Sequence, residues 1–142
     1  MNKEERPILI VDDDMVDIMT VRRALKDISV TNPTVAKSNG EDALEYLFDD
    51  NEEDPCIVLL DLNMPKMNGI EFLGKLSESG QKKHVPIIVL TTSKDEQDKI
   101  QSFDLGASGY MLKPVDYDKF VEVMRTIHSY WTLSETPLIG EN

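Results

Sequence analysis

Residues 57–65 read IVLLDLNMP, a run of four apolar residues that ends in an aspartate and a proline-containing turn. A continuous run of Ile, Val and Leu is typical of a strand covered on both faces, as in the middle of a parallel sheet flanked by helices. In open α/β sheets, ligands bind beyond the carboxyl ends of the strands, which is where Asp61 would lie. The stretch therefore predicts a buried strand that presents a carboxylate for chemistry. An aspartate that caps the following turn is the structural alternative.

Other short apolar runs also end in polar residues, and a weaker run at 34–37 adds a further predicted strand. Residues 7–11 lead into Asp12-Asp13-Asp14, residues 86–90 into Thr91-Thr92-Ser93, and residues 110–112 into Lys113-Pro114. The segments between the runs have apolar residues three and four positions apart, which predicts helices. Five strands alternating with five helices predict an α/β fold with a doubly wound, five-stranded parallel sheet.

Polar residues mark the beginnings of several predicted helices. Asp116 is a natural N-cap for the last helix, whose apolar residues recur with helical spacing from Phe120 to Trp131. Ser93 and Glu96 have the spacing of a capping box and predict that the fourth helix begins there. Beyond Leu133 we expect fraying, so residues 1–133 are predicted to form the domain and residues 134–142 a flexible C-terminal tail.

Length and charge exclude several classes of protein. The 142 residues predict one domain, and 15 basic against 27 acidic residues give a net charge of −12, which argues against binding to nucleic acid or to anionic membranes. The first residues lack the apolar stretch of a signal peptide, and no window approaches the ~18 apolar residues of a membrane span. We therefore expect a cytoplasmic protein. Cys56, the single cysteine, is expected to be buried and inert.

The carboxyl ends of parallel strands lie along one rim, so acids, hydroxyls and an amine are predicted to gather there. Clustered carboxylates repel one another unless a cation intervenes, and oxygen ligands suit a hard ion such as Mg²⁺. One carboxylate could then attack phosphorus and form an aspartyl phosphate. The ammonium of Lys113 and the hydroxyl of Thr91 are suitable groups to stabilise the charge on the transferring phosphoryl group.

These motifs together resemble the receiver domains of two-component response regulators, which include the bacterial chemotaxis regulator. The resemblance implies a flavodoxin-like fold with strand order 2-1-3-4-5. It covers about residues 8 to 127. The matching features are Asp12-Asp13, the segment LDLNMP at 60–65 followed by Gly69, Thr91 after an apolar strand, Gly109-Tyr110, and Lys113-Pro114.

The resemblance implies a role for each of these residues. Asp61 would be the phosphoacceptor and would bind Mg²⁺, or Mn²⁺ in its place, together with Asp13. Asn63 would add its backbone carbonyl to the metal, and Asp12 would assist through a water molecule. Lys113 would contact the phosphoryl group, and its bond to Pro114 is expected to be cis, as in the family. Asp14 is interpreted as a helix cap.

The resemblance also implies a switch and partners. On phosphorylation Thr91 would move towards the new oxygens, and Tyr110 would turn inward, changing the face built from the fourth helix, fifth strand and fifth helix. Such a protein receives its phosphoryl group from a sensor histidine kinase or a phosphotransfer protein and passes the signal to a protein target or along a phosphorelay. It would catalyse only its own phosphorylation and dephosphorylation, so we do not expect an enzyme with a separate substrate.

Three segments resemble the single-domain regulators that pair with bacterial phytochrome-type kinases. That subgroup tends to dimerise through the fourth-helix/fifth-strand/fifth-helix face, and Trp131 and Leu133 would suit this interface if they were exposed. Trp131 also continues the core stripe of its helix, so monomer and dimer both stay open. The three segments are residues 49–54, 89–93 and 130–133.

Two alternatives compete with the receiver interpretation. Residues 8–16 partly match the haloacid-dehalogenase-like phosphatases, in which Asp12 would be the nucleophile and Asp14 the general acid. That interpretation lacks the further acidic pair such enzymes need after a late strand, and it leaves Asp61 without a role. The second alternative is a receiver-like binding module that is never phosphorylated, and it is disfavoured because no part of the site is missing.

Overall fold

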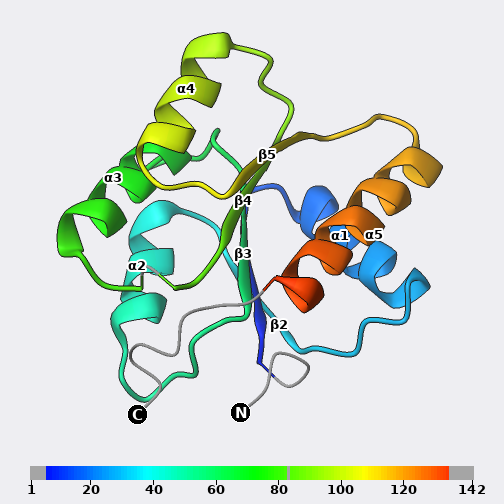
Figure 1. The fold of residues 1–142 in the computed structure, drawn as a ribbon, viewed down its shortest axis with the longest axis horizontal. Helices are drawn as coiled ribbons and strands as arrows, with labels where there is room; N and C mark the ends of the chain where they lie inside the picture. The colour runs from blue at the N-terminus through cyan, green and yellow to red at the C-terminus, as the bar shows by residue number, and fades with distance from the viewer. Residues whose placement is uncertain (1–5, 83, 135–142) are drawn as a thin grey trace.

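The computed structural model describes residues 6–82 and 84–134. Within these ranges five strands alternate with five helices, and the strands form one parallel sheet in the order β2-β1-β3-β4-β5 (Figure 1). This confirms the predicted doubly wound fold and strand order. The predicted tail, apart from Ser134, lies outside the described residues. The elements are β1 (Ile8–Val11), α1 (Met15–Asp27), β2 (Thr34–Lys37), α2 (Gly40–Phe48), β3 (Ile57–Leu60), α3 (Gly69–Ser79), β4 (Ile87–Thr91), α4 (Glu96–Asp104), β5 (Gly109–Leu112) and α5 (Tyr117–Leu133).

Helices cover both faces of the sheet, which explains why the central strands β1 and β3 are apolar at every position. α1 and α5 lie on one face, and α2, α3 and α4 lie on the other (Figure 1). Successive side chains of a strand point to opposite faces. In β3, Ile57 and Leu59 accordingly join the core cluster that contains α1 and α5, whereas Val58 and Leu60 join the cluster that contains α2 and α3. β2, at the edge of the sheet, is half-buried throughout.

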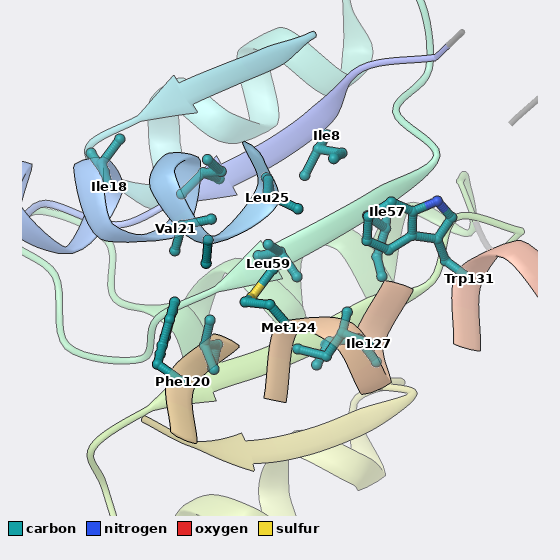
Figure 2. Packing of buried hydrophobic residues seen from close by; sticks show 14 of the residues in the cluster. Ile8, Ile18, Val21, Leu25, Ile57, Leu59, Phe120, Met124, Ile127 and Trp131 are labelled. Carbon is teal, nitrogen blue, oxygen red and sulfur yellow. The ribbon is translucent and has the colours of Figure 1, made fainter. Parts of the chain in front are cut away.

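α5 supplies the largest side chains of the core on its side of the sheet. Phe120, Met124, Ile127 and Trp131 are all buried, and they pack towards α1 and the central strands (Figure 2). Trp131 is 1% exposed, so it is a core residue and is unavailable for an interface. Leu133, two residues further on, is 80% exposed.

Short polar side chains begin the helices, as the sequence predicted for α1 and α5. Asp14, Asn39 and Asp116 each accept a hydrogen bond from a backbone N–H of the first turn. The predicted start of α4 is wrong. Its N-cap is Asp95, which accepts from the N–H of Gln97, and the helix begins at Glu96.

Ser93 has a different contact. Its hydroxyl donates to Asp98 at 2.7 Å, and Asp95 is closer in sequence to the first turn, so Asp95 takes the capping position. Cys56 is buried at the start of β3, as expected. Among the helices of the described ranges, none combines the length and the apolar character of a membrane span.

Candidate functional site

The register of the sheet brings the acids of β1 and β3 together. Val11 is paired with Leu60 in the parallel ladder, so Asp12 and Asp61 follow side by side at the carboxyl end. The ladder continues into the site, because the N–H of Asp61 donates to the carbonyl of Val11 at 2.9 Å. The N–H of Lys113 likewise donates to the carbonyl of Thr91 at 2.8 Å, which extends the pairing of β5 with β4. Backbone hydrogen bonds therefore fix the positions of the site residues.

Three carboxylates lie close enough to share one cation. Asp12, Asp13 and Asp61 each have an oxygen within 4.8 Å of the others. Asp12 and Asp61 are buried, whereas Asp13 is exposed, so the cluster opens to solvent on one side. A set of oxygen donors with an open side suits a hard divalent ion such as Mg²⁺ or Mn²⁺, which keeps several waters.

Lys113 is the cation at this cluster. Its ammonium donates to Oδ2 of Asp12 at 2.8 Å and to Oδ2 of Asp17 at 2.9 Å, and it lies 3.7 Å from Oδ2 of Asp61. Its side chain is only 9% exposed. Three carboxylates therefore surround one buried ammonium, with Asp61 just beyond hydrogen-bonding distance.

The pKa values of Asp12 and Lys113 are both raised, but for different reasons. Burial raises the pKa of Asp12, and repulsion from Asp61 adds to the rise, against the opposing hydrogen bonds from Lys113 and the N–H of Asp14. Burial alone would lower the pKa of Lys113. The hydrogen bonds to Asp12 and Asp17 and the charges of Asp12 and Asp61 outweigh it and raise that pKa. Lys113 is therefore held firmly in its charged form.

Thr91 and Tyr110 both contact Ser93, at the start of the loop between β4 and α4. Thr91 is fully buried at the end of β4, and its hydroxyl accepts from the N–H of Ser93 at 3.3 Å. The hydroxyl of half-buried Tyr110 donates to the carbonyl of Ser93 at 3.0 Å. The two residues predicted to form a switch thus share one backbone segment, which connects the site to α4.

The loop after Asp61 is packed closely against the start of α3. The N–H of Gly69 donates to the carbonyl of Leu62 at 2.9 Å. A Cβ atom at position 69 would lie 2.6 Å from the carbonyl oxygen of Asp61, closer than real Cβ atoms come to other atoms. Glycine is therefore required where α3 meets this loop. The side chain of Asn63, within the loop, is exposed.

The predicted cis bond between Lys113 and Pro114 is wrong for this structure. No cis peptide bond occurs in residues 6–82 and 84–134. The trans form of an X-Pro bond is favoured by about 0.5–1 kcal/mol in general, and the structure follows this preference.

Two acids at the start of α1 compare differently with the prediction. Asp14 is a helix cap, as interpreted from the sequence, because its carboxylate accepts from the N–H groups of Val16 and Asp17. This occupies the group that the phosphatase alternative needs as a general acid. Asp17 was not predicted to take part, yet it binds Lys113. Asp17 lies in the first turn of α1, where acids are common because they complement the helix dipole, so its place in the sequence did not point to Lys113.

Comparison with known proteins identifies the family. The model for the response regulator receiver domain matches residues 8–125, which is most of the chain. The chain therefore belongs to the response regulator receiver family, and its function class is two-component signal transduction. This agrees with the sheet order and with the acids, hydroxyl and lysine at its carboxyl rim. The phosphatase alternative is not favoured.

Similar proteins include regulators associated with phytochromes. Response regulator Rcp1 of Synechocystis sp. is 31% identical over 138 residues, which cover 92% of this chain and 94% of Rcp1. The phosphorylated cyanobacterial phytochrome response regulator RcpA has a structure with a TM-score of 0.85 and 29% identity, covering 94% of this chain and 99% of RcpA. The Mn²⁺-bound form of Rcp1 has a TM-score of 0.83 and 30% identity, covering 93% and 99% of the two chains.

Proposed function

We propose that this protein accepts a phosphoryl group on Asp61 and signals through the resulting change in its protein-binding face. The observation that carries the proposal is the position of Asp61. It is buried at the end of β3 beside Asp12 and Asp13, with the ammonium of Lys113 at 3.7 Å. An ionised carboxylate near a metal site and an ammonium is suited to attack on phosphorus.

In the transfer, an oxygen of Asp61 forms a bond to phosphorus while the bond between phosphorus and the donor's histidine nitrogen breaks. The nitrogen keeps the electron pair and takes up a proton. Lys113 and the Thr91 hydroxyl stabilise the charge on the phosphoryl oxygens. Hydrolysis reverses the modification when water attacks the same phosphorus, so the protein catalyses only its own phosphorylation and dephosphorylation.

The metal site of this proposal uses oxygen ligands only. Asp13 and Asp61 would bind Mg²⁺ or Mn²⁺ directly, the backbone carbonyl of Asn63 would add a third ligand, and Asp12 would assist through water. The cation supplies positive charge that offsets the phosphoryl charge. The open side at Asp13 supports this assignment, because a site of this kind needs room for water and for a phosphoryl oxygen.

The donor in this proposal is a sensor histidine kinase of the phytochrome type. Its support is the likeness to Rcp1 and to the phytochrome response regulator RcpA over nearly the whole of each chain. The receiver of the signal is a protein target or a phosphotransfer protein. We place these exchanges in the cytoplasm, and the net charge of −12 favours protein partners over nucleic acid.

The response to phosphorylation would pass through Thr91 and Tyr110. Thr91 would leave Ser93 to donate to a phosphoryl oxygen, and Tyr110 would turn inward. Their hydrogen bonds to Ser93 support this, because a shift of either one acts directly on the segment before α4.

We also propose that the protein forms a homodimer through the face built from α4, β5 and α5. Several large apolar residues of these elements are exposed between 38% and 80%, and apolar residues that gather on one exposed face are suited to an interface. They are Ile100, Phe103, Leu112, Tyr130 and Leu133. Sedimentation with and without a phosphoryl analogue tests the proposed homodimer. Phe103→Asp should give a monomer in both states, and an unchanged dimer would contradict this interface.

Intact mass after incubation with acetyl phosphate and Mg²⁺ tests the proposed function. The wild type should gain about 80 Da, one phosphoryl group, and Asp61→Asn should gain nothing. Asp14→Asn is the matched control, since Asn also caps helices well and the variant should label normally. If Asp61→Asn still takes the label or turns over substrate while Asp12→Asn or Asp14→Asn is dead, the phosphatase alternative is right. A wild type that takes no label would support the non-phosphorylated binding module.

A further inference from the structure

We propose that Asp17 is a positioning residue that holds the Lys113 ammonium back from Asp61 and so opposes phosphoryl binding. The inference rests on the proposed function, since it concerns the same lysine. The observation behind it is the hydrogen bond of 2.9 Å from Lys113 to Asp17. Asp17 belongs to α1 and lies outside the metal-binding cluster of Asp12, Asp13 and Asp61.

The donors of Lys113 explain why Asp17 competes with the phosphoryl group. An ammonium has three N–H donors. Two are taken by Asp12 and Asp17 at 2.8 and 2.9 Å, whereas Asp61 is at 3.7 Å and receives no hydrogen bond. A phosphoryl group on Asp61 needs the ammonium at hydrogen-bonding distance. Movement of Lys113 towards it must weaken a bond that the lysine makes now.

Asp17 is the partner that Lys113 can lose at the smaller cost. The side chain of Asp17 is 38% exposed, against 5% for Asp12. Asp17 and Lys113 line the same hollow of about 270 Å³, together with Thr20 and Thr92. Because its carboxylate borders this hollow, water can replace the ammonium there, whereas the buried carboxylate of Asp12 would be left without a counter-charge.

The charge of Asp17 acts in the same direction as its hydrogen bond. A fourth carboxylate near Asp12, Asp13 and Asp61 makes the rim more negative, which favours a cation and disfavours an anion such as a phosphoryl group. Loss of that charge and release of Lys113 should both strengthen anion binding. The same two changes should weaken binding of a divalent cation, because the freed ammonium moves towards Asp61 and competes with the cation for that carboxylate.

Asp17→Asn tests the proposal by a pair of binding measurements with opposite expected signs. Affinity for beryllofluoride, an analogue of the phosphoryl group, is measured by calorimetry at saturating Mg²⁺. Affinity for Mg²⁺ is measured in the same way without beryllofluoride. We expect beryllofluoride to bind about three- to tenfold tighter and Mg²⁺ about threefold weaker, the range for a charged hydrogen bond that is partly exposed.

Asp14→Asn is the matched control. It removes the same charge from the same helix start, keeps the cap, and changes a residue whose carboxylate accepts from Val16 and Asp17 N–H groups instead of from Lys113. Both affinities should stay within about twofold of wild type, since exposed charges act weakly.

Three results would overturn the proposal. If both affinities of Asp17→Asn fall together with its melting temperature, Asp17 only supports the packing of α1. If the control gains as much as Asp17→Asn, the effect is that of net charge. If neither affinity moves, Lys113 is not held back by Asp17. A wild type that binds Mg²⁺ but no beryllofluoride would instead refute the proposed function.

Discussion

α4 and α5 flank the same strand, β5, yet they are attached to the protein in different ways. α5 buries four apolar side chains, including Trp131 and Met124. α4 buries one residue within the described ranges, Ser102, whose hydroxyl is bound to the carbonyl of Asp98 in the same helix. Its apolar residues Ile100 and Phe103 are 47% and 48% exposed. α5 is therefore part of the core, and α4 is a surface element.

The difference locates stability and adaptability on separate elements. Burial of apolar area is the main source of folding free energy, so the α1 and α5 side of the sheet should account for much of it. Elements with few buried apolar contacts open at low free energy. α4 can therefore change position without loss of the fold. It is also the helix that follows Ser93, where Thr91 and Tyr110 make their contacts.

Trp131→Ala should have the largest effect, because it removes a fully buried aromatic side chain from α5. We expect the free energy of unfolding to fall by about 3–5 kcal/mol, measured by urea denaturation followed by circular dichroism. Leu133→Ala, two residues later and exposed, is the control and should change stability by about 0.5 kcal/mol or less. A loss below about 1 kcal/mol for Trp131→Ala would show that the burial of α5 contributes little to the stability of the core.

Hydrogen exchange should separate the two helices directly. Amides in the middle of α5 should exchange with a free energy close to that of global unfolding. Those of α4 should exchange with a value lower by about 2 kcal/mol or more, since local opening of α4 exposes little apolar area. Native-state exchange read by NMR at increasing urea gives both values. Equal protection of Met124 and Ile100 would remove the distinction.

Tyr110→Phe should have a smaller effect, confined to the attachment of α4. The variant loses the hydrogen bond to the Ser93 carbonyl, which costs about 1 kcal/mol, and amides of residues 93–96 should exchange faster. Exchange followed by mass spectrometry and urea denaturation together measure this. Tyr130→Phe, on the exposed surface of α5, should leave both measurements at the wild-type values. The assignment fails if residues 93–96 are equally protected in Tyr110→Phe.

The smallest effect concerns pH and the contact of α5 with α1. Loss of hydration, the hydrogen bond to Asp27 and the charge of Asp27 raise the pKa of Tyr117, and Arg23 opposes the rise. A pKa that is higher in the folded state than in the unfolded state gives a contribution that is complete below about pH 10, the ordinary value for tyrosine. That contribution is lost as pH rises through the folded pKa.

Titration of tyrosinate absorbance checks the Tyr117 prediction. The transition that disappears in Tyr117→Phe belongs to this residue. Asp27→Asn should move that transition to lower pH, because it removes the negative charge beside the Tyr117 hydroxyl and replaces the carboxylate that accepts its hydrogen bond. A transition that stays in place would mean that Asp27 does not govern the titration.

Features that depend on neighbouring residues were predictable from the sequence. The apolar runs, the caps at Asp14 and Asp116, and the gathering of strand ends at one rim all follow from local patterns and one topological rule. The start of α4 was not, because two candidate caps, Ser93 and Asp95, lie two residues apart and the local pattern does not rank them. The capping box of α3, Asn68 with Glu71, has the required spacing and was overlooked.

Contacts between distant residues were the harder part of the site. Lys113 was placed at the rim from the fold alone, but its partner Asp17 is 96 positions away. Whether a helix residue reaches a strand-end lysine depends on how α1 lies over the sheet, which the sequence pattern does not specify. The cis bond at Pro114 was taken from a family likeness and had no local signal, and it is trans in the structure.

The position of Trp131 also decides which optical signals the protein can give. It is the single tryptophan in the chain, it is 1% exposed, and it lies towards the Ile57 end of β3, whereas Asp61 follows the other end (Figure 2). Its emission should therefore be blue-shifted, resist quenching by iodide or acrylamide, and report denaturation while staying nearly silent to ligands at the carboxylates. A fluorescent reporter of signalling would need a second indole or a dye near α4.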